Sequence, residues 1–213
     1  MPYKTILFDL DGTLTDPYLG ISNSVKYALQ KFDITENNQK TLRAFIGPPL
    51  ANSFMDFYHF DINKAKTAIE YYREYYSEKG IYENQLYPGI DHLLSKIRDN
   101  NKVSILATSK PTAFASRILK HFNIDNYFYD IKGSDLDGAM VKKDEIIKFI
   151  MEKHNLQKET TIMIGDRKYD IEGTRKNGID SIAVLYGYGS REELDECEPV
   201  YTCKTAADIL GIV

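Results

Sequence analysis

The chain of 213 residues carries 27 lysines and arginines against 31 aspartates and glutamates, so its formal net charge is −4. Its hydrophobic content of 43% is that of an ordinary globular protein, and the mildly acidic balance argues against a nucleic-acid polymer as partner. The longest apolar run, residues 209–213, is far shorter than the ~20 residues of a membrane-spanning helix. We therefore expect neither a membrane protein nor a nucleic-acid-binding protein.

The cysteines and the N-terminal sequence bear on the expected location. Cys197 and Cys203 are too few for a disulfide framework, and we interpret them as free thiols in a reducing cytosol. The opening Met-Pro-Tyr-Lys lacks the basic segment and following apolar segment of a signal peptide. The expected location is therefore cytoplasmic. A monomer and a homodimer are both compatible with these features.

The first predicted elements are a strand and a block of helices. Residues 4–8 form a short apolar run that stops at Asp-Leu-Asp-Gly, which is typical of a buried strand followed by a turn. Helical periodicity without any good strand then follows over four segments: residues 20–32, 37–45, 49–58 and 62–79. Helices inserted after the first strand would lie over a site at its end as a lid.

The rest of the chain alternates between strands and helices. Short apolar runs predict strands over residues 103–107, 160–164 and 181–185. Helical spacing predicts helices over residues 90–99, 144–153 and 168–177, the last ending at Gly178. This alternation predicts an α/β fold with a parallel sheet covered on both sides. We expect an α/β core of residues 1–16 and 84–213, interrupted by an α-helical cap of residues 17–83.

Polar side chains follow three of the predicted strands. Asp9 and Asp11 follow the first strand, Thr108 the second and Asp166 the third. Because ligands of parallel sheets bind beyond the carboxyl ends of the strands, we expect these groups to meet at one edge of the sheet. That convergence, more than any single motif, indicates a functional site.

Paired carboxylates are the first chemical signal at this edge. Asp9 and Asp11 stand two residues apart, and like charges this close are unfavourable unless one holds a proton or a cation lies between them. Mg²⁺ suits them because it binds one or two carboxylates together with a substrate phosphate. Asp166 and Asp170, one helical turn apart, could add to the same cation. The plainer alternatives are that Asp-x-Asp-Gly marks a turn and that Asp170 caps a helix.

Groups that could bind phosphate accompany the carboxylates. Thr108 and Ser109 could offer hydroxyl and backbone donors to phosphate oxygens, or could form an ordinary turn. Lys142 or Lys143, just before a predicted helix, could neutralise phosphate charge. Two adjacent lysines on a surface loop would otherwise be unremarkable.

These motifs and their order resemble the four motifs of the haloacid dehalogenase (HAD) superfamily. The resemblance lies in Asp-Leu-Asp-Gly-Thr at residues 9–13, in Thr108, in a later lysine and in Gly-Asp-Arg-x-x-Asp at residues 165–170, and it covers essentially the whole chain. The helical insertion resembles the C1 cap of the phosphoglycolate phosphatase-like branch. Residues 45–50 and 186–189 resemble the subgroup of phosphoglycolate phosphatases and 5′-nucleotidases. The resemblance implies a Rossmann-like parallel sheet with an inserted helical cap.

The resemblance further implies a Mg²⁺-dependent phosphomonoester hydrolase with an aspartyl-phosphate intermediate. Asp9 would attack phosphorus, and Asp11 would protonate the leaving oxygen and then activate water. The metal would be held by the Asp9 carboxylate, the Asp11 backbone carbonyl and Asp166. Asp170 would support the metal's water shell.

For the phosphoryl group, the resemblance implies contacts from Thr108, Ser109 and Lys143. Many relatives have Lys-Pro at the third motif, whereas this chain has Lys-Lys-Asp at residues 142–144. Lys143 is favoured over Lys142 because its spacing to the following Ile-Ile pair resembles the nucleotidase-like subgroup.

The substrate is expected to depend on the cap. Arg43 and the turn at Gly47 are the cap features most expected to face the site, where an arginine would suit a carboxylate or a second phosphate. Arg43 is otherwise a solvated helix residue. The preferred substrate is a small phosphorylated metabolite, phosphoglycolate first and a nucleoside monophosphate as the alternative. A phosphate-binding protein without turnover is the other alternative, and Asp11 argues against it because binding needs no acid or base.

Overall fold

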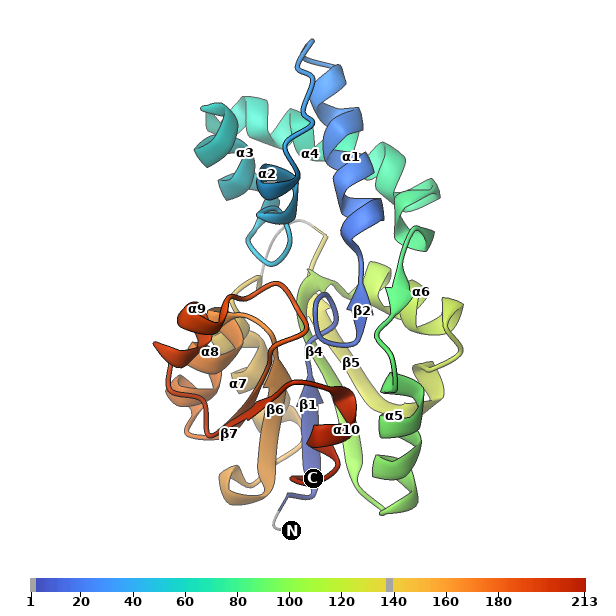
Figure 1. Ribbon diagram of the computed structural model, residues 1–213, viewed down its shortest axis with the longest axis vertical. Coiled ribbons are helices and arrows are strands. Elements are labelled where there is room, and N and C mark those ends of the chain that lie inside the picture. Colours follow the sequence, from blue (N-terminus) through green and yellow to red (C-terminus); the bar gives the residue numbers. More distant parts are fainter. Residues whose placement is uncertain (1–2, 137–139) are drawn as a thin grey trace. The chain divides into compact units, whose positions relative to one another are not determined.

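The computed structural model describes residues 3–136 and 140–213 (Figure 1). The chain divides into two compact units, one made of Met1–Asp16 together with Leu86–Val213 and the other of Pro17–Gln85. The first is an α/β unit and the second is helical. Among the described residues, no helix combines the length and the apolar character that crossing a membrane requires.

A six-stranded sheet forms the centre of the α/β unit (Figure 1). Its order is β5-β4-β1-β6-β7-β8, and each neighbouring pair is parallel. The strands are β1 (Thr5–Phe8), β4 (Val103–Pro111), β5 (Phe128–Ser134), β6 (Thr161–Gly165), β7 (Asp180–Val184) and β8 (Tyr201–Cys203). The predicted α/β fold with a Rossmann-like parallel sheet is confirmed.

Helices cover this sheet, which explains why its central strands are apolar. The side chains of Ile6, Leu7 and Phe8 in β1 are completely buried. Three isoleucines of α7 (Lys143–Lys153) share one core cluster with Leu7. The other helices are α5 (Ile90–Asp99), α6 (Thr112–His121), α8 (Lys168–Asn177), α9 (Arg191–Asp195) and α10 (Ala206–Ile209), with 3-10 turns η2 (Asp125–Tyr127) and η3 (Lys158–Thr160). The three helices predicted in this unit agree with α5, α7 and α8 to within one residue.

Several elements of the α/β unit were not predicted. The sequence indicated neither the strands β5 and β8 nor the helices α6, α9 and α10. β5 is an edge strand in which Tyr129 is 72% exposed, so no continuous apolar run marks it. β4 continues to Pro111 instead of ending at residue 107, and its pairing with β5 is irregular between Ala107 and Pro111. The polar residues after 107 therefore belong to the last part of a strand.

The helical unit contains the four helices that periodicity predicted, with ends shifted by at most two residues. They are α1 (Tyr18–Gln30), α2 (Gln39–Arg43), α3 (Leu50–Tyr58) and α4 (Ile62–Glu78), followed by the 3-10 turn η1 (Gly80–Tyr82). Its core is aromatic, since the ring of Phe54 lies 5.1 Å from that of Phe45 and stacks on Phe60 at 6.1 Å. Where the chain leaves and re-enters the α/β unit, β2 (Thr15–Asp16) pairs with β3 (Gln85–Leu86).

Candidate active site

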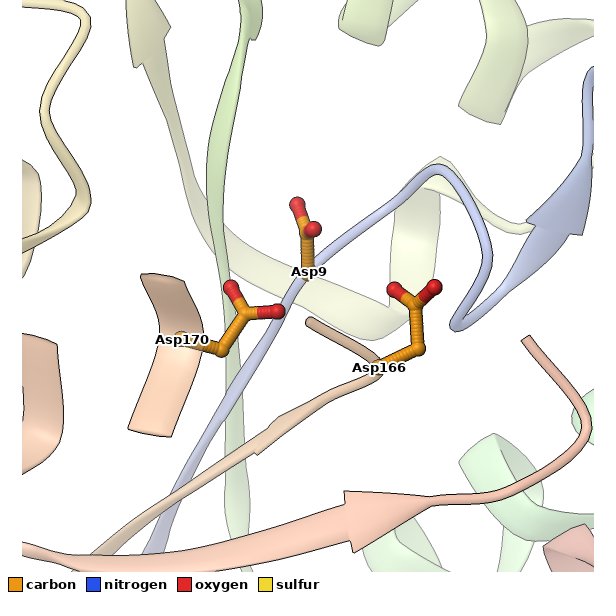
Figure 2. A group of neighbouring side chains, drawn as sticks. All are labelled: Asp9, Asp166 and Asp170. Carbon is orange, nitrogen blue, oxygen red and sulfur yellow. The ribbon is translucent and has the colours of Figure 1, made fainter. Parts of the chain in front are cut away.

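Three carboxylates meet at the carboxyl ends of two neighbouring strands (Figure 2). Asp9 follows β1, Asp166 follows β6, and Asp170 lies in the first turn of α8. One oxygen from each lies within 4.8 Å of the others. β1 and β6 are parallel neighbours, with Phe8 beside Ile164, so the two segments end at the same edge. The predicted meeting of Asp9 and Asp166 at one edge is confirmed.

A buried lysine neutralises part of this cluster. The Nζ of Lys143 lies 2.8 Å from Asp9 Oδ1 and 2.9 Å from Asp170 Oδ1, and it donates to the carbonyl of Ala107 at 2.9 Å. Burial alone would lower the pKa of Lys143, but Asp170 and Asp9 outweigh burial and raise it. Lys142 is exposed and lies 3.7 Å from Glu145. Of the two adjacent lysines, Lys143 is therefore the one beside Asp9.

Asp166 is completely buried and is held by polar contacts from two loops. Its Oδ1 accepts from the hydroxyl of Thr13 at 3.1 Å, and its Oδ2 accepts from the backbone N–H of Tyr188 at 2.8 Å. Burial raises its pKa well above the usual range, and Asp170 and Asp9 raise it further. Burial and the two carboxylates therefore outweigh the Tyr188 amide and the Arg167 guanidinium, which act to lower this pKa. The sequence did not indicate Thr13 or the Tyr188 amide as partners of Asp166.

Asp170 caps a helix and also belongs to the group of three carboxylates. Its Oδ2 accepts from the backbone N–H of Arg167 at 3.1 Å, which caps the start of α8. Its Oδ1 faces Lys143. Burial raises the pKa of Asp170 to about 6; Asp9 also raises it, while Lys143 opposes the shift. A helix-capping contact therefore does not remove Asp170 from the cluster.

The loop after Asp9 is tight and closely packed. The backbone N–H groups of Leu14 and Thr15 donate to the carbonyl of Leu10 at 2.9 and 3.0 Å. Gly12 has φ +85°, and a Cβ at this position would lie 2.1 Å from Asp166 Oδ2. A side chain at Gly12 would therefore be strained in its backbone and would displace Asp166.

Asp11 forms an ion pair with a second lysine, Lys110. Its Oδ2 lies 2.6 Å from the Nζ of Lys110, and the two side chains are 15% and 7% exposed. Burial raises the pKa of Asp11. Lys110 opposes this increase, whereas the nearby charge of Asp9 adds to it. The sequence motifs did not indicate a role for Lys110. The available signal was a basic residue close behind the polar end of the second predicted strand.

Thr108 and Ser109 lie near the end of β4. Thr108 is buried, and its hydroxyl oxygen accepts from the backbone N–H of Lys110 at 3.3 Å. The carbonyl of Ser109 accepts from the hydroxyl of Ser134 at 2.8 Å. Both residues thus belong to β4 and not to a separate turn, and the contact between Ser134 and Ser109 holds the end of β4 beside β5.

The two remaining predicted site residues belong to the helical unit. Arg43 is the last residue of α2, and its guanidinium lies 5.7 Å from the ring centre of Tyr18, a favourable cation–π distance. Gly47 has φ +107° in the turn before α3.

The charges of the α/β site are suited to a hard cation. Asp9, Asp11, Asp166 and Asp170 face only two ammonium groups among the described residues, those of Lys110 and Lys143. The fully ionised cluster would thus have two negative charges in excess. Oxygen donors with this excess match the ligand preferences of Mg²⁺, so the residues present fit a divalent metal.

Comparison with known proteins points to one family. The family described as haloacid dehalogenase-like hydrolase matches residues 6–184. A 5′-nucleotidase of Pseudomonas aeruginosa is 43% identical over 99% of this chain and 96% of its own length. A phosphoglycolate phosphatase of Vibrio parahaemolyticus is 26% identical over 99% and 96%. The tyrosine-protein kinase PtkA of Mycobacterium tuberculosis is 34% identical over 91% of this chain and 66% of its own.

A solved structure agrees with this result. The crystal structure described as a predicted phosphatase from Clostridium acetobutylicum has 46% sequence identity and a TM-score of 0.94, covering 100% of both chains. The matched segment, residues 6–184, includes every residue of the carboxylate–lysine cluster. The chain therefore belongs to the haloacid dehalogenase-like hydrolase family, in which it is an enzyme of the phosphatase type.

Proposed function

We propose that this protein is a Mg²⁺-dependent phosphomonoester hydrolase in which Asp9 forms an aspartyl-phosphate. The observation that carries the proposal is the environment of Asp9, whose carboxylate lies beside Lys143 and within the group formed with Asp166 and Asp170. A nucleophile for phosphorus needs positive charge nearby to receive the phosphoryl oxygens. In this proposal the unit of Met1–Asp16 and Leu86–Val213 is catalytic and Pro17–Gln85 is the cap.

The metal would be held by the Asp9 carboxylate, the Asp11 backbone carbonyl and Asp166, with Asp170 supporting the metal-bound water. The excess of negative charge and the raised pKa of Asp166, caused by burial and by its carboxylate neighbours, support this assignment. When bound, Mg²⁺ would offset the carboxylate charge and polarise the phosphoryl group.

The residues of the chain would carry out two displacements. In the first, a carboxylate oxygen of Asp9 bonds to phosphorus, the ester P–O bond breaks, and the leaving oxygen takes a proton from Asp11. In the second, a water molecule gives a proton to Asp11 and its oxygen bonds to phosphorus. The bond between phosphorus and Asp9 then breaks, which releases phosphate and restores both carboxyl groups.

Lys143, Thr108 and Ser109 are proposed to hold the transferring phosphoryl group. The ammonium of Lys143 is fixed by three oxygen partners, so it would not have to reorganise as charge develops on the phosphoryl oxygens. Thr108 and Ser109 occupy the end of β4, the strand next to β1. A phosphoryl group on Asp9 would therefore lie close to both strand ends.

For the substrate, we propose a small phosphomonoester, with nucleoside 5′-monophosphates first. The support is the higher identity to the 5′-nucleotidase, 43%, than to the phosphoglycolate phosphatase, 26%. This order reverses the preference drawn from the sequence. Arg43 and Gly47 of the helical unit are the proposed substrate-side residues, because a cation there would suit a second anionic group.

The test is hydrolysis of p-nitrophenyl phosphate with and without Mg²⁺, followed by a panel of nucleoside 5′-monophosphates, 2-phosphoglycolate and ATP. ATP belongs in the panel because one relative is named a kinase. We expect Mg²⁺-dependent phosphate release, and a loss of more than about 1,000-fold in Asp9→Asn with an unchanged circular dichroism spectrum. Absence of turnover across the panel, or full activity of Asp9→Asn, would refute the proposal.

A further inference from the structure

We propose that Lys110 is a positioning residue for proton transfer, which holds the Asp11 carboxylate by Oδ2 so that Oδ1 faces the leaving group. This inference deepens the proposed function and rests on it. Neither the motifs nor the roles implied by the family resemblance assigned a part to Lys110.

The first support is the contact itself. Lys110 Nζ and Asp11 Oδ2 are 2.6 Å apart, and their side chains are only 7% and 15% exposed. A charge-assisted contact this short, away from bulk water, restricts the carboxylate far more than an exposed ion pair does.

The fold brings this lysine to Asp11 from a distant part of the sequence. β4 and β1 are parallel neighbours, with Leu106 beside Phe8, so the last residues of β4 and the loop that follows β1 lie at the same edge of the sheet. The hydroxyl of Thr108 accepts from the backbone N–H of Lys110 at 3.3 Å. The backbone of Lys110 is thus held in place, and the side chain reaches Asp11 from a strand end.

The different contacts of the two carboxylate oxygens of Asp11 support a role in proton transfer. Asp11 Oδ1 is buried and has no hydrogen-bond partner among the described residues, whereas Oδ2 is occupied by Lys110. The other buried lysine, Lys143, contacts Asp9 and Asp170. The two lysines therefore serve different carboxylates, and Oδ1 is the Asp11 oxygen left to exchange a proton.

Two substrates with different leaving groups can distinguish a role of Lys110 in positioning Asp11 from a general electrostatic effect. Phenol is a poorer leaving group than p-nitrophenol, so phenyl phosphate depends more on protonation of its leaving oxygen. The value of kcat/KM reports the first displacement for both esters. If Lys110 positions Asp11, Lys110→Met should lower kcat/KM for phenyl phosphate at least about tenfold more than for p-nitrophenyl phosphate, within the range of general acid catalysis.

Three variants complete the kinetic experiment. Lys110→Arg keeps the charge and should restore part of the phenyl phosphate activity. Lys120→Met, at an exposed lysine of α6, is the matched control and should resemble the wild type. In an Asp11→Ala background, Lys110→Met should cause no further loss. Equal losses on both esters, or an undiminished Lys110→Met effect in the Asp11→Ala background, would overturn the proposal.

A structural measurement separates this proposal from the proposed function. In crystal structures, Lys110→Met should release the Asp11 carboxylate from its position while Asp9 stays in place, and Lys110→Arg should retain both. An Asp11 side chain that does not move in Lys110→Met would refute the positioning role whatever the activity. Absence of turnover in the wild type, by contrast, would refute the proposed hydrolase.

Discussion

At the residue scale, the site is defined by the way in which two buried lysines are shared among four carboxylates. Lys143 lies between Asp9 and Asp170, and Lys110 binds Asp11. Asp166 receives its contacts from a hydroxyl and a backbone amide instead. Buried charges need partners, and removing one partner leaves the other uncompensated. We therefore expect each lysine to affect folding as well as the proposed chemistry.

Lys143 and Lys142 form a matched pair for testing this point. Lys143→Met should reduce phosphatase activity by at least about 100-fold and lower the free energy of unfolding by about 3–5 kcal/mol, because Asp9 and Asp170 lose a buried partner. Lys142→Met should change that energy by less than about 1 kcal/mol, since its pair with Glu145 is exposed. Urea unfolding and steady-state kinetics measure both effects. Similar results for the two variants would contradict the assignment of Lys143 to the site.

At the scale of elements, helix α7 connects the site to the edge of the sheet. It begins at Lys143, and its last residue, Lys153, lies 2.7 Å from Asp130 of β5, as does the following His154. Burial alone would raise the pKa of Asp130, but the hydrogen bonds from Lys153 and His154 lower it. The far end of α7 is thus tied to the edge strand that the sequence did not indicate.

The contacts of Asp130 with Lys153 and His154 predict that stability depends on pH. A carboxyl whose pKa is lower in the folded state stabilises the protein above its unfolded pKa of about 3.9, and that contribution is lost as the pH falls through the folded pKa. Asp130→Asn should therefore cost about 0.5–1 kcal/mol at neutral pH and almost nothing at the acid end of the series. Urea unfolding at a series of pH values measures the difference. In a Lys153→Met background, Asp130→Asn should lower the free energy of unfolding by less. If the loss caused by Asp130→Asn does not depend on pH, the ion pair is not its cause.

At the scale of the whole molecule, folding assembles the site from segments that are far apart in the chain. Asp9 lies near the N-terminus, whereas Asp166 and Asp170 follow the helical unit, the strands β4, β5 and β6, and several helices. A metal that needs these carboxylates together would bind the folded chain and not the unfolded one. Metal binding would therefore stabilise the fold.

The expected measurement is a rise in thermal midpoint with Mg²⁺. At a concentration of 100 times the dissociation constant, binding to the folded state alone adds about 2.7 kcal/mol to the free energy of unfolding. EDTA should reverse the effect, and NaCl at equal ionic strength should not reproduce it. Asp166→Asn should abolish most of the shift. If this variant responds to Mg²⁺ as the wild type does, Asp166 does not hold the metal.

Much of the fold followed from local patterns. The helices α1, α4, α5, α7 and α8 and the strands β1, β6 and β7 coincide with predicted segments to within two residues, because apolar spacing along the chain records which face is buried. β5 was not predicted, because this edge strand contains an exposed tyrosine and lacks the continuous apolar run that marks a buried strand. The end of β4 was misplaced because its polar residues still pair with the next strand.

What the sequence by itself determined is most of the central elements and the order of acidic motifs at their ends, including Asp9, Asp11 and Asp166. Only the tertiary structure decided that Lys143 and not Lys142 is buried against Asp9, and that Lys110 reaches Asp11. The physical reason is that periodicity is a property of neighbouring residues, whereas these ion pairs depend on the register between strands that are distant in the chain. That register is set by packing of the whole sheet.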